Sequence, residues 1–219
     1  GKGPAPKKRG RDGLQVTVHG GDRAVEQPAQ PGAGDVMDAV FAERVLAFRT
    51  RGTFIFQDSV DAFICKYFSI HPPPDDIHYL PGFSTFGLFL GGGNAQAQGS
   101  DIAIAVESQK RIWLTSVIAR GGAHFFAARV DFESRTIFIM ESLQVPDHYA
   151  IDMLEQIVAT ATDLFPWERV FLEVELQQEN DCGLQTINNV IASAFPHFVR
   201  FTRATAADFY VSNSVGLRN

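Results

Sequence analysis

Cys182 stands where a cysteine thiol can become a nucleophile. The string QQENDCG joins an extended segment to an amphipathic helix, so Cys182 falls in the first helical turn, with Asn180 or Asp181 as the cap. Unpaired backbone N–H groups at a helix start favour the thiolate and can bind an oxyanion. Gly183 would let a substrate backbone come close. A buried structural cysteine is the competing interpretation, and these residues alone do not decide between the two.

A predicted hairpin supplies a base and an acid for this thiol. If Phe132 pairs with Arg135 across a two-residue turn, facing residue numbers sum to 267 and Glu141 becomes a diagonal neighbour of His124 on one face of the sheet. A three-residue turn would move Glu141 to the other face unless a bulge restored it. Asp131 has the opposite strand parity to His124, which argues against it as the acid. With a carboxylate on its own face, His124 is preferred as a base over a lone surface histidine.

These residues define one mechanism. His124 would take the proton of Cys182 or form an ion pair with it, and Glu141 would fix the imidazole tautomer. The thiolate would attack a carbonyl carbon to give an acyl-enzyme, a reaction that needs no metal and no cofactor. A side-chain amide from Gln177 or Gln178 could help to bind the oxyanion. The predicted chemistry is acyl transfer to water or to an amine.

The elements that position these residues follow from the hydrophobic periodicity. Helices are expected over 35–51, from Asp58 or Ser59 to the prolines at 72–74, after Asp147, and over 182–195. Strands are expected over 112–118, 124–132, 136–140, 170–176 and 198–202. We expect GGGNAQAQGS (91–100) to be a surface loop and HPPPDDIH (71–78) to be an exposed, turn-rich loop rather than a metal site. Mixed helices and strands give an α+β class.

The composition predicts one folded domain behind a tail. The chain has 219 residues, of which 45% are hydrophobic and 20% are charged, enough to bury a single core. Residues 1–34 hold six Lys/Arg and three Asp/Glu, so the net charge of -6 divides into +3 for the tail and -9 for the rest. We therefore expect a mobile, basic, Gly/Pro-rich tail over 1–34 and a single domain over 35–219.

Several classes of protein are excluded by the same composition. No apolar segment suits a membrane span or a signal peptide, which predicts an intracellular protein of the cytoplasm or nucleus. The acidic body argues against nucleic-acid binding, whereas the basic run over 7–11 suits a nucleic-acid patch, nuclear import or a solubilising leader. Two cysteines, Cys65 and Cys182, are too few for a disulfide framework or a cysteine-based zinc site.

The order His124, Glu141, Gln178, Cys182 resembles the ubiquitin-like-protein protease family, the SUMO-deconjugating enzymes. The strings AHFFAARVDFESRTIFIMESL and QQENDCG carry the likeness, which runs from about residue 58 to residue 195. The same papain-like clan contains the adenovirus maturation protease, adenain. The resemblance implies a papain-like-clan cysteine protease fold, with a central mixed sheet and the nucleophile at the N-terminus of a core helix. It also implies that Cys182 is the nucleophile, His124 the base, Glu141 the orienting acid and Gln178 the oxyanion donor.

Three departures from the family pattern indicate a divergent member. Glu141 stands where the deconjugases usually have aspartate and is similar to the adenovirus enzyme, which points to a viral or mobile-element relative. Phe125 replaces the tryptophan that commonly closes over the Gly-Gly tail of the substrate, which weakens the case for SUMO itself. The glutamine is nearer to Cys182 than in typical members, so Gln177 remains the alternative to Gln178.

The resemblance implies a cysteine endopeptidase or isopeptidase whose partner is a ubiquitin-like modifier or a polyprotein. Two alternatives stay open. A YopJ-type acyltransferase has a similar His, Glu, Cys order, but it typically requires an inositol phosphate on a basic surface, and 19 Lys/Arg less the six of the tail leave only 13 for the body. A non-catalytic binding domain of the same fold is disfavoured because all three reactive positions are present.

Overall fold

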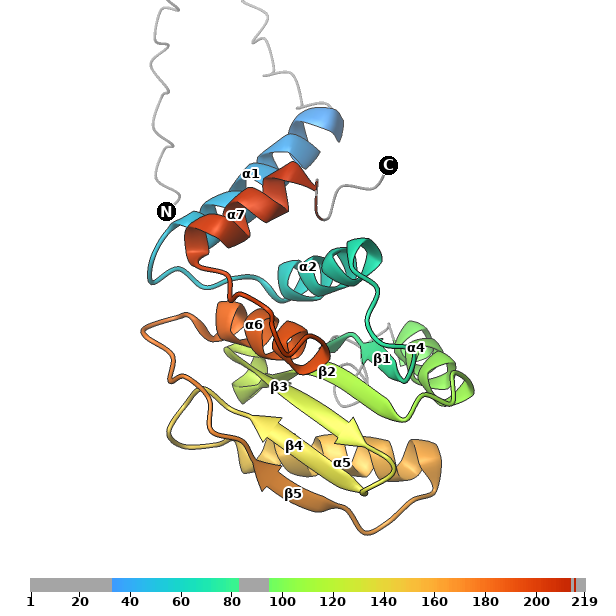
Figure 1. The fold of residues 1–219 in the computed structure, drawn as a ribbon. Coiled ribbons are helices and arrows are strands. Elements are labelled where there is room, and N and C mark those ends of the chain that lie inside the picture. Colours follow the sequence, from blue (N-terminus) through green and yellow to red (C-terminus); the bar gives the residue numbers. More distant parts are fainter. Residues whose placement is uncertain (1–32, 83–94, 214, 216–219) are drawn as a thin grey trace, which may run out of the picture.

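A computed structural model describes residues 33–82, 95–213 and 215. The predicted tail over 1–34 therefore lies outside the described residues, apart from its last two positions, which begin the first helix. The described part of the chain forms a five-stranded mixed sheet with helices on both faces (Figure 1). This arrangement agrees with the predicted α+β class.

The sheet has its strands in the order of the chain. They are β1 (Ile77–Leu80), β2 (Ile112–Ala119), β3 (His124–Asp131), β4 (Thr136–Met140) and β5 (Glu168–Phe171). The central strands β2, β3 and β4 pair antiparallel, whereas the edge strands β1 and β5 pair parallel to their neighbours. The antiparallel centre explains how a short turn can place residues of β3 and of the segment after β4 side by side.

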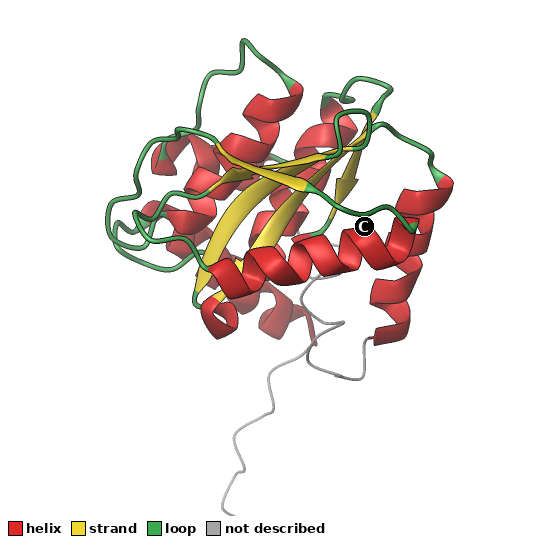
Figure 2. Cartoon of the chain, turned by 90° about the horizontal axis from the view of Figure 1, so that it is seen from below, coloured by secondary structure: helices red, strands yellow, loops and turns green. Residues whose placement is uncertain are grey.

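The helices form layers on the two faces of this sheet (Figures 1 and 2). Their bounds are α1 (Ala33–Arg49), α2 (Gln57–Ile70), α4 (Ala95–Glu107), α5 (His148–Thr162), α6 (Cys182–Ala194) and α7 (Arg203–Ser212), with a short 3-10 turn, η1 (Arg120–Gly122), between β2 and β3. Helices α2 and α6 pack on one face and α4 and α5 on the other, while α1 and α7 pack against each other outside α2. None of the helices in these described segments combines the length and apolar character that crossing a bilayer requires.

Strand alternation divides the interior into two cores. Ala127 of β3 joins the core beneath α6, whereas Phe126 and Ala128 join the core beneath α5. Helix α6 is the central helix, because its residues from Cys182 to Ile191 are all buried. Helix α5 begins as predicted at Asp147, whose side chain accepts a hydrogen bond from the Ala150 backbone N–H.

The predicted hairpin register is confirmed, although the ladder stops at Asp131 and Thr136, so the turn spans residues 132–135 and the predicted pairing of Phe132 with Arg135 is absent. Asp131 faces Thr136 and Ala127 faces Met140, so facing residue numbers sum to 267 along the ladder. The alternation of apolar side chains fixes this register, because a shift by one residue would turn each buried side chain of β4 to the opposite face.

Four predicted elements are wrong. Residues 95–100 of the predicted loop 91–100 lie in α4, since Ala and Gln favour helix; residues 91–94 lie outside the described residues. Ile77 and His78 belong to β1 rather than to a loop. The strand expected over 170–176 ends at Phe171, because its partner β4 ends at Met140. The strand expected over 198–202 does not pair; the Phe201 backbone N–H instead donates to the Asn188 side chain at 2.8 Å.

Candidate active site

His124 and Glu141 form a short, buried hydrogen bond. His124 Nε2 lies 2.6 Å from Glu141 Oε1, and each side chain is 3% exposed. His124 opens β3 and Glu141 directly follows β4, so the hairpin register brings them together. Glu141 Oε1 also accepts from the Leu143 backbone N–H at 2.9 Å, which fixes the carboxylate. The bond at Nε2 leaves Nδ1 as the ring nitrogen for another partner.

That partner is Cys182. Cys182 lies within interaction range of the His124 side chain, whose pKa it raises, and Cys182 is 2% exposed. Cys182 is the first residue of α6, so the partial positive charge of the helix N-terminus acts on its sulfur. The three predicted residues Cys182, His124 and Glu141 thus meet in one buried cluster, at the junction of two strand ends and a helix start.

Electrostatics at the cluster favour a charged imidazole. Burial by itself lowers the pKa of His124, but the hydrogen bonds and charges of Cys182 and Glu141 outweigh burial and raise this pKa from 6.5 to about 9. His124 is therefore an imidazolium at neutral pH. Such a cation next to a cysteine stabilises the thiolate, which is the nucleophilic form.

Aromatic side chains cover the sulfur. Cys182 packs with Ile118 and Phe125 in a small apolar cluster, and Phe54 packs against this cluster from the segment before α2. The rings of Phe54 and Phe125 lie 5.3 Å apart between centroids. Cys182 is buried among these side chains, and a low effective dielectric strengthens its electrostatic interaction with His124. Phe54 has no counterpart in the sequence-based prediction, because an aromatic residue before a helix carries no signal for an active site.

Gly183 has a packing role in addition to the predicted backbone access. A Cβ at this position would lie 3.0 Å from Ile55 Cβ and 3.3 Å from Val60 Cγ2. Glycine therefore allows the first turn of α6 to pack tightly against the segment that leads into α2.

The cap of α6 is held from a distant part of the chain. Asp181 is the N-cap residue, but its side chain makes no capping hydrogen bond and instead accepts from Arg203 Nε at 2.7 Å. The Arg203 guanidinium also donates to the backbone oxygens of Ala47, Thr50 and Thr53. Arg203 thereby ties the turn before Cys182 to the loop after α1. No local pattern could have identified this residue, since it lies 22 positions from Asp181.

The two candidate oxyanion donors differ in their contacts. The Gln177 amide is engaged on both sides, because its Oε1 accepts from Ser142 Oγ at 3.0 Å and its Nε2 donates to the Glu179 backbone oxygen at 2.9 Å. Gln178 is exposed, and its Oε1 accepts from Arg51 Nη2 at 3.2 Å. The Arg51 contact on the oxygen leaves the Gln178 amide nitrogen as the donor end. Gln178 is accordingly the better candidate of the two.

Other residues considered in the sequence lie away from the cluster. Asp131 ends β3, at the opposite end of the strand from His124, and accepts hydrogen bonds from the turn amides of Glu133 and Ser134. His78 lies in β1, and Asp76 pairs with Arg111. The described residues contain no group of His, Cys, Asp and Glu side chains arranged to hold a metal ion.

Cys65 differs chemically from Cys182. Its side chain lies on the exposed side of α2. Desolvation by the surrounding protein nevertheless raises its pKa to about 12, and the negative charges of Asp61 and Asp101 add to this rise. A thiol with this pKa is almost entirely protonated at neutral pH. Cys65 is therefore a poor nucleophile at neutral pH.

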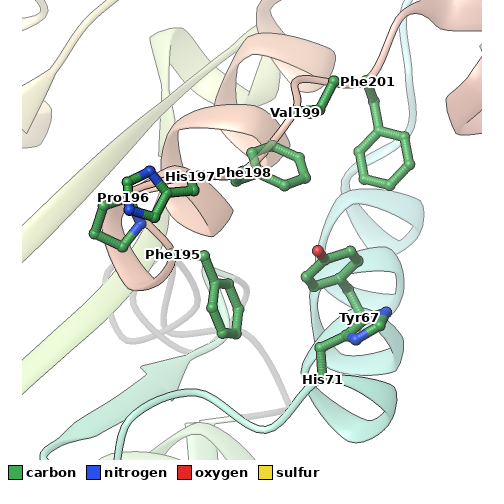
Figure 3. A pocket seen from close by; sticks show the side chains of 8 residues that line it. All are labelled: Tyr67, His71, Phe195, Pro196, His197, Phe198, Val199 and Phe201. Carbon is green, nitrogen blue, oxygen red and sulfur yellow. The ribbon is translucent and has the colours of Figure 1, made fainter.

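The described surface carries cavities at different distances from this cluster. One, of about 520 Å³, lies at the far end of α6 from Cys182 and is lined by Tyr67, His71 and the segment 195–201 (Figure 3). Helix α6 has 13 residues, so this aromatic cavity is about 18 Å from Cys182 along the helix axis. Another, of about 380 Å³, is lined by Arg120, Ser142, Leu143, Gln144, Val145, Leu176 and Gln177, of which Leu143 donates its backbone N–H to Glu141.

Comparison with solved structures identifies the architecture. The Ulp1 protease domain in complex with Smt3, the yeast ortholog of SUMO, superposes with a TM-score of 0.60 at 14% identity, over 79% of this chain and 80% of that domain. The protein has the Ulp1 protease fold. The Xanthomonas campestris effector XopD, bound to ubiquitin, superposes on this chain with a TM-score of 0.57 at 12% identity, over 87% of this chain and 98% of XopD.

Comparison of the sequence with family models and curated proteins identifies no relative. The Ulp1-like SUMO protease domain of Chaetomium thermophilum is 18% identical, with a TM-score of 0.50, over 74% of this chain and 71% of that domain. At these identities the likeness establishes the Ulp1-like fold, and the chemistry has to be argued from the side chains.

Proposed function

We propose that this protein is a cysteine protease that cleaves an amide bond at the C-terminus of a ubiquitin-like modifier or within a polyprotein. The observation that carries the proposal is the buried cluster in which Glu141 lies 2.6 Å from the His124 ring and Cys182 interacts with the same ring. Support for a ubiquitin-like substrate comes from the similar structures, in which Ulp1 is bound to Smt3 and XopD to ubiquitin.

In the first half of the reaction, the Cys182 thiolate attacks the substrate carbonyl carbon and forms a C–S bond. The negative charge that moves to the carbonyl oxygen is bound by the backbone N–H groups at the start of α6 and by the Gln178 amide. The His124 imidazolium then gives its proton to the leaving nitrogen, and the C–N bond breaks. This leaves a thioester on Cys182 and a neutral imidazole.

In the second half, His124 takes a proton from water and the resulting hydroxide attacks the thioester carbon. The C–S bond breaks, and the product leaves with a new carboxyl group. The imidazolium and thiolate are then restored. Glu141 keeps Nε2 engaged throughout, so Nδ1 carries the proton in each transfer.

The test uses ubiquitin and SUMO that each carry a C-terminal vinyl sulfone, which traps a nucleophilic cysteine. We expect a covalent adduct on Cys182 with at least one of the two probes. The adduct should be lost in Cys182→Ala and His124→Ala and retained in the matched control Cys65→Ala. Absence of an adduct with both probes, together with no cleavage of either modifier's precursor, would contradict ubiquitin and SUMO as substrates. A Cys182 that iodoacetamide alkylates no faster than Cys65 would contradict the cysteine protease itself.

A second comparison assigns the oxyanion donor. Loss of one such donor reduces kcat by about 10²- to 10³-fold. We expect this loss in Gln178→Ala and a smaller one in Gln177→Ala. The reverse order would give the role to Gln177.

A further inference from the structure

The cavity of about 380 Å³ beside the cluster is built on the segments that carry the triad. Its wall from Ser142 to Val145 directly follows Glu141, and Arg120 lies four residues before His124. The opposite wall contains Gln177, whose backbone N–H donates to the Ser142 oxygen at 3.0 Å. This cavity and the catalytic cluster therefore share one rigid frame.

The apolar part of the cavity is unusually open to solvent. Val145 is 66% exposed and Leu176 is 50% exposed, and Leu143 lies half-buried between them. Exposed large apolar side chains that border a cavity next to a reaction centre favour contact with an apolar group of the substrate.

The one charged residue of the lining is Arg120. Its guanidinium donates to the Val145 backbone oxygen at 3.2 Å, and it forms no ion pair with any carboxylate of the described segments. The nearest acid, Asp147, is engaged by backbone N–H groups of Arg120 and Ala150. Arg120 thus offers a positive charge and N–H donors without an acceptor among the described residues, and no carboxylate lines the cavity to compete for them.

The backbone conformation at Arg120 indicates that its side chain is held in a defined position. Arg120 has a φ of 50°, in the left-handed region that costs a non-glycine residue about 1 kcal/mol or more. Gly121 and Gly122 follow with φ of 67° and 96°. This turn directs the Arg120 side chain toward Val145, four residues before the catalytic histidine.

The mechanism determines which side of the scissile bond the cavity serves. His124 must reach the leaving nitrogen to protonate it, so the leaving segment passes on the His124 side of Cys182. The cavity is flanked by the residues that precede His124 and follow Glu141. It therefore lies on the leaving-group side.

We infer that this cavity is a specificity subsite for the leaving segment of the substrate and takes an apolar side chain adjacent to a carboxylate. The apolar side chain contacts Leu143, Val145 and Leu176, and the carboxylate pairs with Arg120. The inference rests on the proposed function and adds a preference on the side of the bond that the modifier does not occupy.

The test uses SUMO and ubiquitin, each joined at its C-terminus to one of three leaving groups. These are aminomethylcoumarin, which has no peptide, the peptide Ser-Leu-Glu-Leu-Glu-Ser, and its charge-reversed form Ser-Leu-Lys-Leu-Lys-Ser. We expect kcat/KM to be about tenfold higher for the Leu-Glu peptide than for the Leu-Lys peptide. Arg120→Glu should reverse this preference, and Arg120→Gln, the milder change, should abolish it.

The apolar wall is tested with Leu176→Asp. The ratio of kcat/KM for the Leu-Glu peptide to that for the coumarin substrate should fall about tenfold. Leu46→Asp, which changes a leucine of α1 that is 61% exposed, is the matched control and should leave this ratio unchanged.

The outcomes separate the inference from the proposed function. If the wild type cleaves the coumarin substrates but shows equal rates for the two peptides, the inference fails and the proposed function stands. If Arg120→Glu keeps the wild-type preference, the assignment of Arg120 is wrong. If no modifier is cleaved with any leaving group, the proposed function fails and the inference fails with it.

Discussion

Glu141→Gln tests whether the carboxylate sets the charge state of His124. The substitution keeps the size of the side chain and an oxygen that can accept from His124 Nε2, but it removes the negative charge 2.6 Å from the ring. The charged imidazole loses its anionic partner on one side and keeps Cys182 on the other. The pKa of His124 should therefore fall.

The size of the expected fall follows from how far the pKa of His124 is raised in the wild type. The rise from 6.5 to about 9 corresponds to about 3 kcal/mol in favour of the imidazolium. Glu141 and Cys182 each contribute a hydrogen bond and a charge, and together they also offset the opposing effect of burial. Removal of the Glu141 charge should bring the pKa of His124 down from about 9 toward its ordinary value of 6.5.

The direct assay is an NMR titration of the imidazole carbons, with the His124 signal among the six histidines identified by its loss in His124→Ala. A raised pKa means that the imidazolium persists through neutral pH and is lost as pH rises through about 9. Consequently kcat/KM should decline over that range in the wild type and at lower pH in Glu141→Gln. A His124 that titrates near 6.5 in the wild type, or at about 9 in both proteins, would refute this reasoning.

Three further results are expected. At pH 7 iodoacetamide should alkylate Cys182 at least about 100-fold faster than Cys65, as measured by mass spectrometry of each cysteine peptide. The pKa of Cys65, about 12, leaves it a thiolate fraction of only about 10⁻⁵. Equal rates would count against an ion pair between Cys182 and His124. Phe54→Ala should accelerate that alkylation of Cys182 by uncovering the sulfur, and a slower reaction would show that Phe54 does not shield it. Arg203→Lys should lower the free energy of unfolding by about 2–4 kcal/mol in urea denaturation, because several hydrogen bonds of the guanidinium are lost; an unchanged midpoint would show that Asp181 does not depend on Arg203.

The meeting of Glu141 with His124 and the start of α6 at Cys182 could be predicted largely because they depend on local rules. The hairpin between β3 and β4 is closed by a short turn, so the turn length and the strand parity together set the approach of Glu141 to His124. The start of α6 at Cys182 is signalled by the change from an extended to a helical apolar pattern. Neither step requires contacts between distant parts of the chain.

The errors occur where distant contacts decide the structure. The alternation over 170–176 has the period of a strand, but β4 ends at Met140 and the chain beyond Phe171 has no continuous partner. The aromatic residues over 198–202 suit a strand, but Phe201 packs edge-on against Tyr67 of α2. Alternation and aromatic content indicate that a segment is suited to a β-strand. The strand forms only where a neighbouring strand is long enough to pair with it.

The same distinction explains how Cys182, His124 and Glu141 can be brought together in a chain with 14% identity to the Ulp1 domain. The sulfur of Cys182 is placed by the start of α6, by Gly183 against Ile55 and Val60, and by Arg203 on Asp181. These are steric and hydrogen-bonding requirements at a few positions, and most of the remaining core can change if its volume is retained. The triad and its supports are therefore where substitutions should be least tolerated, whereas the open cavity beside them, with Val145 and Leu176 at its rim, is free to vary with the substrate.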